Sequence, residues 1–214
     1  YPVIVPISLA LPTREALKKV VDSGSGAVFS IHYGNPELFT ILEDQGIPVV
    51  VVNNAAYQDR FHTVTVDDSY AAYEATRYLI QLGHRHILHV DYHRPDLPAI
   101  QRDIVGGFKR ALDEAGIPWQ EGNRITSALF DHRELTEKLA TAMEQRPRPT
   151  AVFAHDDNIG ARTMLGLSEI GLNVPEDLSL IALGDLLDYD APYIPQITTL
   201  SYNVSLLGQL AANM

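Results

Sequence analysis

Short polar side chains follow several apolar, β-rich runs of this chain, at the points where each run ends. These runs alternate with segments of helical periodicity, which is the pattern of βαβ units and a parallel sheet. In open parallel sheets, ligands bind beyond the carboxyl ends of the strands, because loops and helix N-termini converge there. The residues that this rule selects are Ser8, Ser30, Asn53, Asp91, Asp156, Asp157 and Asp185. They offer hydroxyl, amide and carboxylate groups without an obvious nucleophile, so they predict hydrogen bonding to a neutral polyol or a cation rather than capture of a phosphate.

Asp157 has two interpretations. It directly precedes an expected helix over 158–170, so it could simply cap that helix by accepting backbone N–H groups. It could equally contact a ligand at the end of the preceding strand. Both interpretations stay open at this point.

The histidines and neighbouring carboxylates of the chain do not predict a catalytic or metal site. Four histidines gather within a short stretch around Asp91: His84, His86, His89 and His93. Imidazole and carboxylate groups are zinc and iron ligands, but the turn at Gly83 and the following strand do not require these side chains to converge. His155, Asp156 and Asp157 are adjacent, and neighbouring residues that leave a strand point in different directions. We therefore expect no catalytic residue, no metal, no cofactor and no enzymatic activity.

Composition narrows the class of protein further. The 214 residues are 46% hydrophobic, enough for a core in one large domain or two lobes. Sixteen basic and 27 acidic residues give a formal charge of -11, so the surface repels phosphate and is not expected to bind nucleic acid by itself. The chain contains no cysteine, which excludes disulfides and favours the cytoplasm. No apolar run reaches the roughly 20 residues of a membrane helix, and residues 1–8 do not resemble a signal peptide.

The expected elements run almost from end to end of the chain. The candidate strands are Pro2 to Ile7, Ala27 to Ile31, Pro48 to Val52, His62 to Val66, His86 to Asp91, Ile125 to Leu129, Ala151 to Ala154, Leu178 to Leu183 and Ile197 to Leu200. The candidate helices are Thr13 to Val21, Ser69 to Leu82, Ile100 to Ala115, Arg133 to Gln145 and Asn158 to Ile170. This alternation predicts an α/β fold of parallel sheets flanked by helices.

Motifs spread over essentially the whole chain occur in a characteristic order. They are Gly46-Ile47-Pro48-Val49-Val50, Val66-Asp67-Asp68, Leu82-Gly83-His84-Arg85-His86-Ile87, Gly107-Phe108-Lys109-Arg110-Ala111-Leu112, Pro149-Thr150-Ala151-Val152-Phe153-Ala154 with Asp157 three residues on, Gly171-Leu172-Asn173-Val174-Pro175-Glu176-Asp177-Leu178-Ser179, Pro195-Gln196-Ile197-Thr198-Thr199-Leu200 and Leu207-Gly208. In this order they resemble the lactose-repressor (LacI/GalR) family of transcription regulators.

The resemblance implies a two-lobed, periplasmic-binding-protein-like core, in which each lobe is a parallel sheet flanked by helices. It places one lobe at 1–66 with 197–214 and the other at 67–196. A small-molecule effector, such as a carbohydrate, would bind between the lobes, and the protein would form a homodimer without membrane contact. Operator DNA would be bound by an N-terminal helix-turn-helix segment absent from this chain. The first lobe is expected to lack its first strand and helix, and the chain to stop before the last strand of the second lobe.

The effector pocket departs from the family pattern at two positions. Ile104 stands where the family has an arginine, with Arg102 two residues earlier, and Gly184 replaces the first of two acids, leaving Asp185. Loss of such a polar contact typically costs about 1–3 kcal/mol of binding, so a sugar would need replacement contacts. Together, strand ends and resemblance predict these effector-binding residues: Ser30, Asn53, Asp91, Arg102, Phe130, His132, Asp156, Asp157, Asp185 and Tyr202.

We therefore expect the effector-binding and dimerisation core of a cytoplasmic, LacI-type DNA-binding regulator that acts as a repressor. The alternative is a periplasmic sugar-binding protein of a transporter or chemoreceptor, which shares the lobes. The sequence upstream separates the two, because a helix-turn-helix favours the regulator and a signal peptide favours the binding protein.

Overall fold

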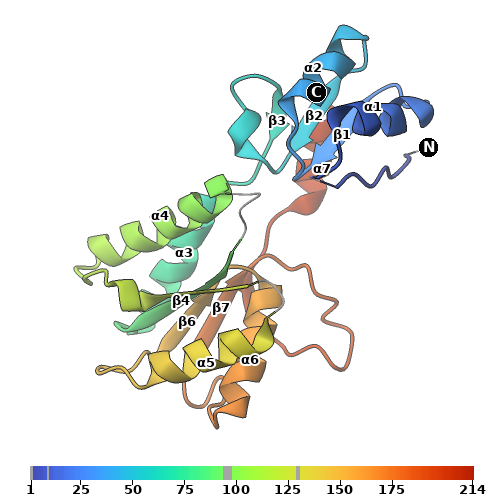
Figure 1. The fold of residues 1–214 in the computed structure, drawn as a ribbon. Coiled ribbons are helices and arrows are strands. Elements are labelled where there is room, and N and C mark those ends of the chain that lie inside the picture. The colour runs from blue at the N-terminus through green and yellow to red at the C-terminus, as the bar shows by residue number, and fades with distance from the viewer. Residues whose placement is uncertain (1, 9, 94–97, 129–130) are drawn as a thin grey trace. The chain divides into compact units, whose positions relative to one another are not determined.

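A computed structural model describes residues 2–8, 10–93, 98–128 and 131–214, and the chain divides into two compact units. The first unit comprises residues up to Val66, the start of α4 and residues from Asn203 onward. The second comprises Asp67 to His93 and Gln101 to Tyr202. Figure 1 shows both units and labels most of their helices and strands.

The first unit is built on three parallel strands in the order β1-β2-β3. Its elements are α1 (Thr13–Asp22), β1 (Val28–Ile31), α2 (Pro36–Asp44), β2 (Val49–Val52), the short 3-10 helix Ala55–Tyr57, β3 (His62–Val64) and α7 (Val204–Ala212). The central strand β2 consists of four buried valines. Val49 and Val51 pack with α1 and α2 on one face, whereas Val50 and Val52 pack with α7 on the other. A strand covered on both faces reads as a continuous apolar run rather than an alternating one.

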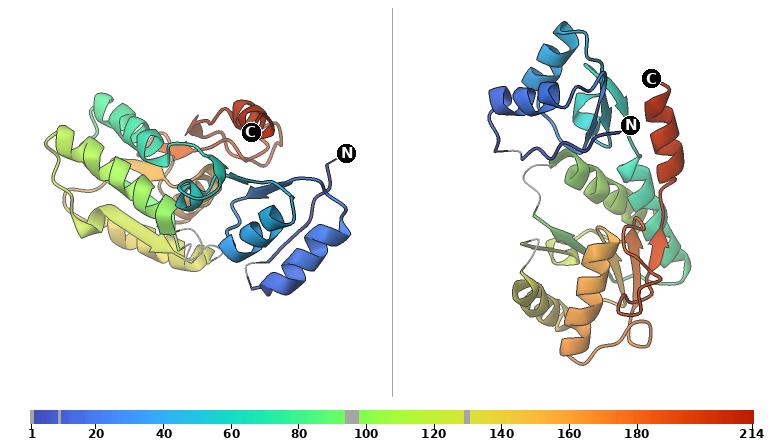
Figure 2. Two further views of the ribbon diagram at one scale, coloured as in Figure 1. Left: turned by 90° about the horizontal axis from the view of Figure 1, so that it is seen from above. Right: turned by 90° about the vertical axis from the view of Figure 1, so that its right-hand side faces the viewer.

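The second unit holds a five-stranded parallel sheet in the order β5-β4-β6-β7-β8. Its elements are α3 (Asp68–Gln81), β4 (Ile87–Tyr92), α4 (Pro98–Glu114), the 3-10 helix Glu121–Asn123, β5 (Arg124–Ser127), α5 (His132–Met143), β6 (Ala151–Ala154), α6 (Asp157–Glu169), β7 (Ser179–Leu183) and β8 (Thr198–Leu200). Figure 2 shows α3 and α4 on one face of this sheet and α5 and α6 on the other. The second pair buries Leu88 and Val90 of β4, while the ring of Phe108 from α4 contacts the ring of His89 from the opposite face.

The strand expected at Pro2 to Ile7 is a wrong prediction. Residues 2–8 form no strand, and the side chain of Ile4 is 92% exposed. Pro2 and Pro6 carry no backbone N–H, so the segment cannot supply a regular ladder of hydrogen bonds. Helices α2 and α7 were absent from the expected helices. The first begins at a proline and is capped by Asn35, whose side chain accepts the Leu38 N–H.

The expected return of the chain to the first lobe at residue 197 also needs correction. Strand β8 pairs in parallel with β7, with Thr198 opposite Ile181 and Leu200 opposite Leu183. Residues 197–202 therefore lie with the second unit, and the first unit resumes at Asn203. Local pattern marks the strand but does not say which sheet its hydrogen bonds join.

Among the residues that the structure describes, no helix is long and apolar enough to cross a membrane.

Candidate ligand-binding site

Polar side chains meet at the carboxyl edge of the second unit's sheet. We call them the carboxyl-edge cluster: Asp68, Asp91, Tyr92, Arg124, His155, Asp156 and Tyr202. They come from the first turn of α3, from β4 and β5, and from the residues that follow β6 and β8. The carboxyl ends of β4, β6 and β8 lie at this edge, and the side chain of Arg124, the first residue of β5, reaches Asp91 there. Residues far apart in the sequence are thus brought together.

Asp91 is the buried centre of this cluster. Its Oδ2 lies 2.5 Å from a guanidinium nitrogen of Arg124, and its Oδ1 lies 2.9 Å from Nδ1 of His155. Gln101 and the Tyr92 backbone N–H also donate to Oδ1. Burial opposes ionisation of Asp91, but the hydrogen bond from His155 and the charges around it hold its pKa well below the usual range. Asp91 is therefore a charged anchor for its neighbours, with its hydrogen-bonding capacity largely used by the protein itself.

His89 lies on the same strand and is completely buried. Burial lowers its pKa to about 4, although the nearby Asp91 charge acts in the opposite direction. Its ring stacks on Phe153, and its Nδ1 lies 3.1 Å from the Phe153 carbonyl oxygen. His84 instead lies within hydrogen-bond distance of Thr150 and Ser179, so these two histidines do not converge. In the described part of the chain, no group of histidines and carboxylates is placed to hold a metal ion.

The capping role expected as one possibility for Asp157 belongs to Asp156. Asp156 Oδ1 accepts the Ile159 N–H at 2.8 Å, and its Oδ2 accepts the hydroxyl of Tyr92 at 2.9 Å. Asp157 is the first residue of α6 and is completely buried. It accepts hydrogen bonds from the Leu187 N–H and the Tyr189 hydroxyl. The helix begins one residue earlier than the apolar pattern indicated, which moves the cap back to Asp156.

Asp68 belongs to the candidate site but is not among the residues that the sequence predicts. The hydroxyl of Tyr202 lies 3.4 Å from its Oδ1, which joins α3 to the segment after β8. Burial raises the pKa of Asp68 to about 6; His155 and Tyr202 oppose that shift, whereas Asp103 and Asp67 add to it. Burial, followed by the nearby charge of Asp68, likewise raises the pKa of the Tyr202 phenol. Asp68 is part of the motif Val66-Asp67-Asp68. Its place in the first turn of a helix that follows a strand could have indicated a ligand-site residue.

We expect Asp68→Asn to stabilise the protein by about 2 kcal/mol at neutral pH, because Asn needs no ionisation while it can still accept the Tyr202 hydroxyl. A raised pKa means that Asp68 favours the folded state when protonated, and this contribution is lost as the pH rises through about 6. The difference between the variant and the wild type should therefore grow from near zero at about pH 4 to its full size at about pH 7.5. Urea denaturation across this range measures it. Asp131→Asn, at the exposed cap of α5, serves as the control, and a pH-independent difference for Asp68→Asn would contradict the expectation.

Two expected site residues lie in the first unit. Ser30, in β1, is buried and donates its hydroxyl to the carbonyl oxygen of Tyr33 at 3.1 Å. Asn53 directly follows β2 with a positive φ of 56°, and Thr65 lies 3.5 Å from its side-chain oxygen. Both are close to the carboxyl ends of their strands, as the strand rule requires.

The remaining expected site residues have other neighbours. Arg102 is exposed and pairs with Asp103, while the Nε2 of His132 lies 3.1 Å from a carboxylate oxygen of Glu169, the last residue of α6. Asp185 is exposed in the segment after β7. Phe130 lies outside the described residues.

The two departures from the family pattern have structural explanations. Ile104 is only 2% exposed, so its side chain forms part of the apolar core of the second unit. Gly184 has a φ of +79°, and its N–H donates to the Leu200 carbonyl at 2.9 Å. An aspartate would be strained in this left-handed conformation.

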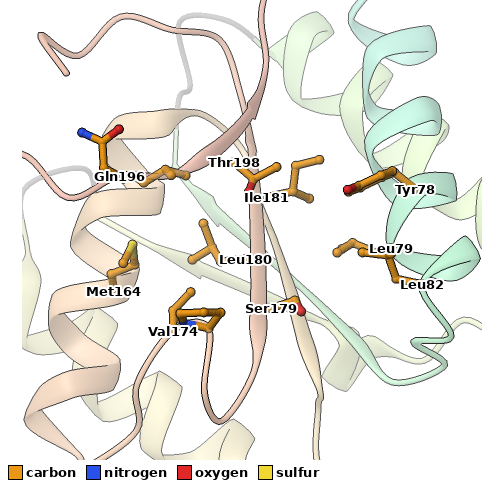
Figure 3. Close-up of a pocket in the computed structure, with 12 residues that line it drawn as sticks. Tyr78, Leu79, Leu82, Met164, Val174, Ser179, Leu180, Ile181, Gln196 and Thr198 are labelled. Carbon is orange, nitrogen blue, oxygen red and sulfur yellow. The ribbon is translucent and has the colours of Figure 1, made fainter. Parts of the chain in front are cut away.

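A separate hollow in the second unit is shown in Figure 3. It lies between α3 and α6 beside the first residues of β7 and β8, and its lining is mostly apolar, with side chains such as Leu79, Met164 and Leu180. No charged residue lines it. The polar groups that a hydrophilic ligand requires are instead those of the carboxyl-edge cluster.

Two parallel α/β units with polar strand ends define a ligand-binding core of the periplasmic-binding-protein type. Residues 76–214 match the model of the periplasmic binding protein-like domain. The chain belongs to this family, in its LacI/GalR branch.

Individual relatives agree with this assignment. The HTH-type transcriptional repressor PurR of Pectobacterium atrosepticum is 32% identical over 186 residues, which are 84% of this chain and 52% of that protein. A putative LacI transcriptional regulator from Bacillus cereus has a similar structure, with a TM-score of 0.74 and 27% identity over 94% of this chain and 71% of that one. A LacI family regulator from Enterococcus faecium with bound ribose gives a TM-score of 0.73 and 26% identity over 93% of this chain and 72% of the other. The chain spans about half the length of the curated relatives that it matches.

Proposed function

We propose that this chain is the effector-binding and dimerisation core of a cytoplasmic, LacI-type transcription regulator that acts as a repressor. Operator DNA would be bound by a helix-turn-helix segment outside these 214 residues, in keeping with the formal charge of -11. The effector would act by binding two arrangements of the lobes with different affinity. Relatives named as transcriptional repressors support this function over that of a periplasmic sugar-binding protein.

The carboxyl-edge cluster is the observation that carries the proposed ligand site. Tyr92, Tyr202 and Arg124 already donate to carboxylates of the cluster, and these carboxylates belong to three aspartates whose oxygens are hydrogen-bond acceptors. A ligand rich in hydroxyl groups would match such acceptors, and the ribose in the Enterococcus faecium regulator is a ligand of that kind. No nucleophile with an adjacent base is found among the cluster's residues, which supports a sensor rather than an enzyme.

Ligand-induced stabilisation tests this function. We expect at least one member of a panel of pentoses, hexoses, disaccharides and nucleosides to raise the melting temperature. A ligand at about 100 times its dissociation constant adds about 2.7 kcal/mol to the stability. Asp156→Asn should weaken that binding, because asparagine still caps the helix but removes the carboxylate charge from the edge.

Asp131→Asn provides the matched control, since it makes the same change at the exposed N-cap of α5. Binding that is unchanged by Asp156→Asn, or lowered equally by Asp131→Asn, would place the ligand elsewhere. No shift from any panel member would contradict a polyhydroxylated effector. Steady consumption of a bound compound would show an enzyme instead of a sensor.

A further inference from the structure

The segment that joins β7 to β8, residues 184–197, starts at the carboxyl edge and forms no helix or strand. We call it the β7–β8 loop. Its start is held where the Gly184 N–H donates to the Leu200 carbonyl oxygen. Near its end, the Gln196 side-chain amide donates to the Tyr189 carbonyl oxygen at 3.1 Å. These bonds close the loop on itself, but they leave its centre to be positioned by another element.

Asp157 supplies that position. Its side chain is completely buried, and its Oδ2 accepts both the Leu187 N–H at 2.9 Å and the Tyr189 hydroxyl at 3.2 Å. Burial, followed by the charge of Asp157 and the hydrogen bond to it, raises the pKa of Tyr189 to about 12. Two donors from the loop therefore converge on one carboxylate oxygen at the start of α6.

Burying a carboxylate is costly unless hydrogen bonds compensate for it. Asp157 does not cap its helix, since Asp156 does so, and its Oδ1 has no hydrogen-bond partner among the described groups. The described hydrogen bonds of the Asp157 side chain all come from the β7–β8 loop. Asp157 therefore serves to hold the β7–β8 loop rather than to cap α6.

The position of Asp157 in the chain connects the loop to the candidate site. Asp156, the preceding residue, caps α6 and accepts the hydroxyl of Tyr92 from β4. Asp157 thus holds the β7–β8 loop, while the adjacent Asp156 belongs to the carboxyl-edge cluster. Any displacement of the loop anchor at Asp157 would act directly on the backbone that carries Asp156.

We propose that Asp157 and Tyr189 form a latch that fixes the β7–β8 loop at the carboxyl edge, so that Asp157 is a positioning residue for the ligand site. The effect on ligand binding rests on the proposed function, whereas the effect on the loop does not. The latch keeps the loop ordered in the absence of ligand and so lowers the cost of closing the site when a ligand binds.

Hydrogen exchange of the ligand-free protein tests the latch itself. Tyr189→Phe removes only the hydroxyl, so we expect amides of residues 185–190 to exchange about five- to tenfold faster while the amides of β6 and β7 keep their rates. Tyr193→Phe makes the same change at a tyrosine of the same loop that is 82% exposed, and it should leave exchange unchanged. Unchanged exchange in Tyr189→Phe, or equal acceleration in both variants, would overturn the latch.

Ligand affinity tests the positioning role of Asp157. It is measured for ribose and for any panel member that stabilises the wild type. We expect Tyr189→Phe to weaken the affinity about three- to tenfold and Tyr193→Phe to leave it unaltered. Unchanged affinity together with faster loop exchange would refute the positioning role. If the wild type binds no panel member, the proposed function loses its support, while the exchange rates still decide the latch.

Discussion

Asp91→Ala is expected to destabilise the second unit by about 3–5 kcal/mol, because it removes one partner of a buried ion pair and leaves the other partner without compensation. The Arg124 side chain remains only 30% exposed, and His155 and Gln101 also lose their acceptor. Chemical denaturation followed by tryptophan fluorescence measures the loss. Trp119 is the only tryptophan of the chain and packs against Phe108 in the second unit, so it reports on the unit that is affected.

Asp185→Ala is the control for this prediction. It removes an exposed aspartate that follows β7, another strand of the same sheet, so we expect a change within about 0.5 kcal/mol. A loss below about 1 kcal/mol for Asp91→Ala would mean that Asp91 is not the anchor of the cluster. A large loss for Asp185→Ala would point to a general sensitivity of this edge rather than to the ion pair.

Gly107→Ala is expected to cost about 3 kcal/mol or more, because α3 and α4 approach each other too closely for a methyl group. A Cβ atom at Gly107 would overlap the carbonyl oxygen of Ser69 and come within 3.0 Å of the Tyr73 backbone nitrogen. Both obstacles are backbone atoms of a helix and cannot move aside as a flexible side chain could. The helices would have to separate and lose part of the packing between them.

Gly106→Ala offers the closest possible comparison, since it makes the same change one residue earlier in the same helix. A Cβ atom there meets nothing within 4 Å, so the higher helix propensity of alanine should stabilise the protein by up to about 1 kcal/mol. Melting temperatures of the two variants should therefore move in opposite directions. A similar small effect in both would show that the helices can separate at little cost.

The sequence pattern predicted most of the strands because their cause is local. The four valines of β2 and the apolar runs of β4, β6 and β7 mark buried strands in any parallel sheet. The segment at residues 2–7 is also apolar, but Pro2 and Pro6 lack backbone N–H groups, and it is not a strand. An apolar run therefore predicts a strand only where its backbone can join a ladder.

The candidate site was predicted in part for the same reason. The strand rule found Asp91 and Asp156, since it needs only the position at which a strand ends. It did not find Asp68, which begins a helix and enters the cluster through Tyr202, 134 residues further along the chain. The cap that was one of two interpretations of Asp157 is provided by Asp156, because the start of a helix is uncertain by one or two residues in a sequence.

By itself, the sequence determined a parallel α/β chain with polar strand ends and the order of LacI/GalR motifs, because periodicity, turn residues and motif spacing are written along the chain. Only the tertiary structure decided which of these polar groups meet. The sheet order β5-β4-β6-β7-β8 places β4 between two strands that follow it in the sequence, which brings Arg124 and His155 to Asp91. The same folding joins Asp157 to Leu187 and Tyr189. Such contacts depend on hydrogen-bonded pairing between distant strands, and no local pattern specifies that pairing.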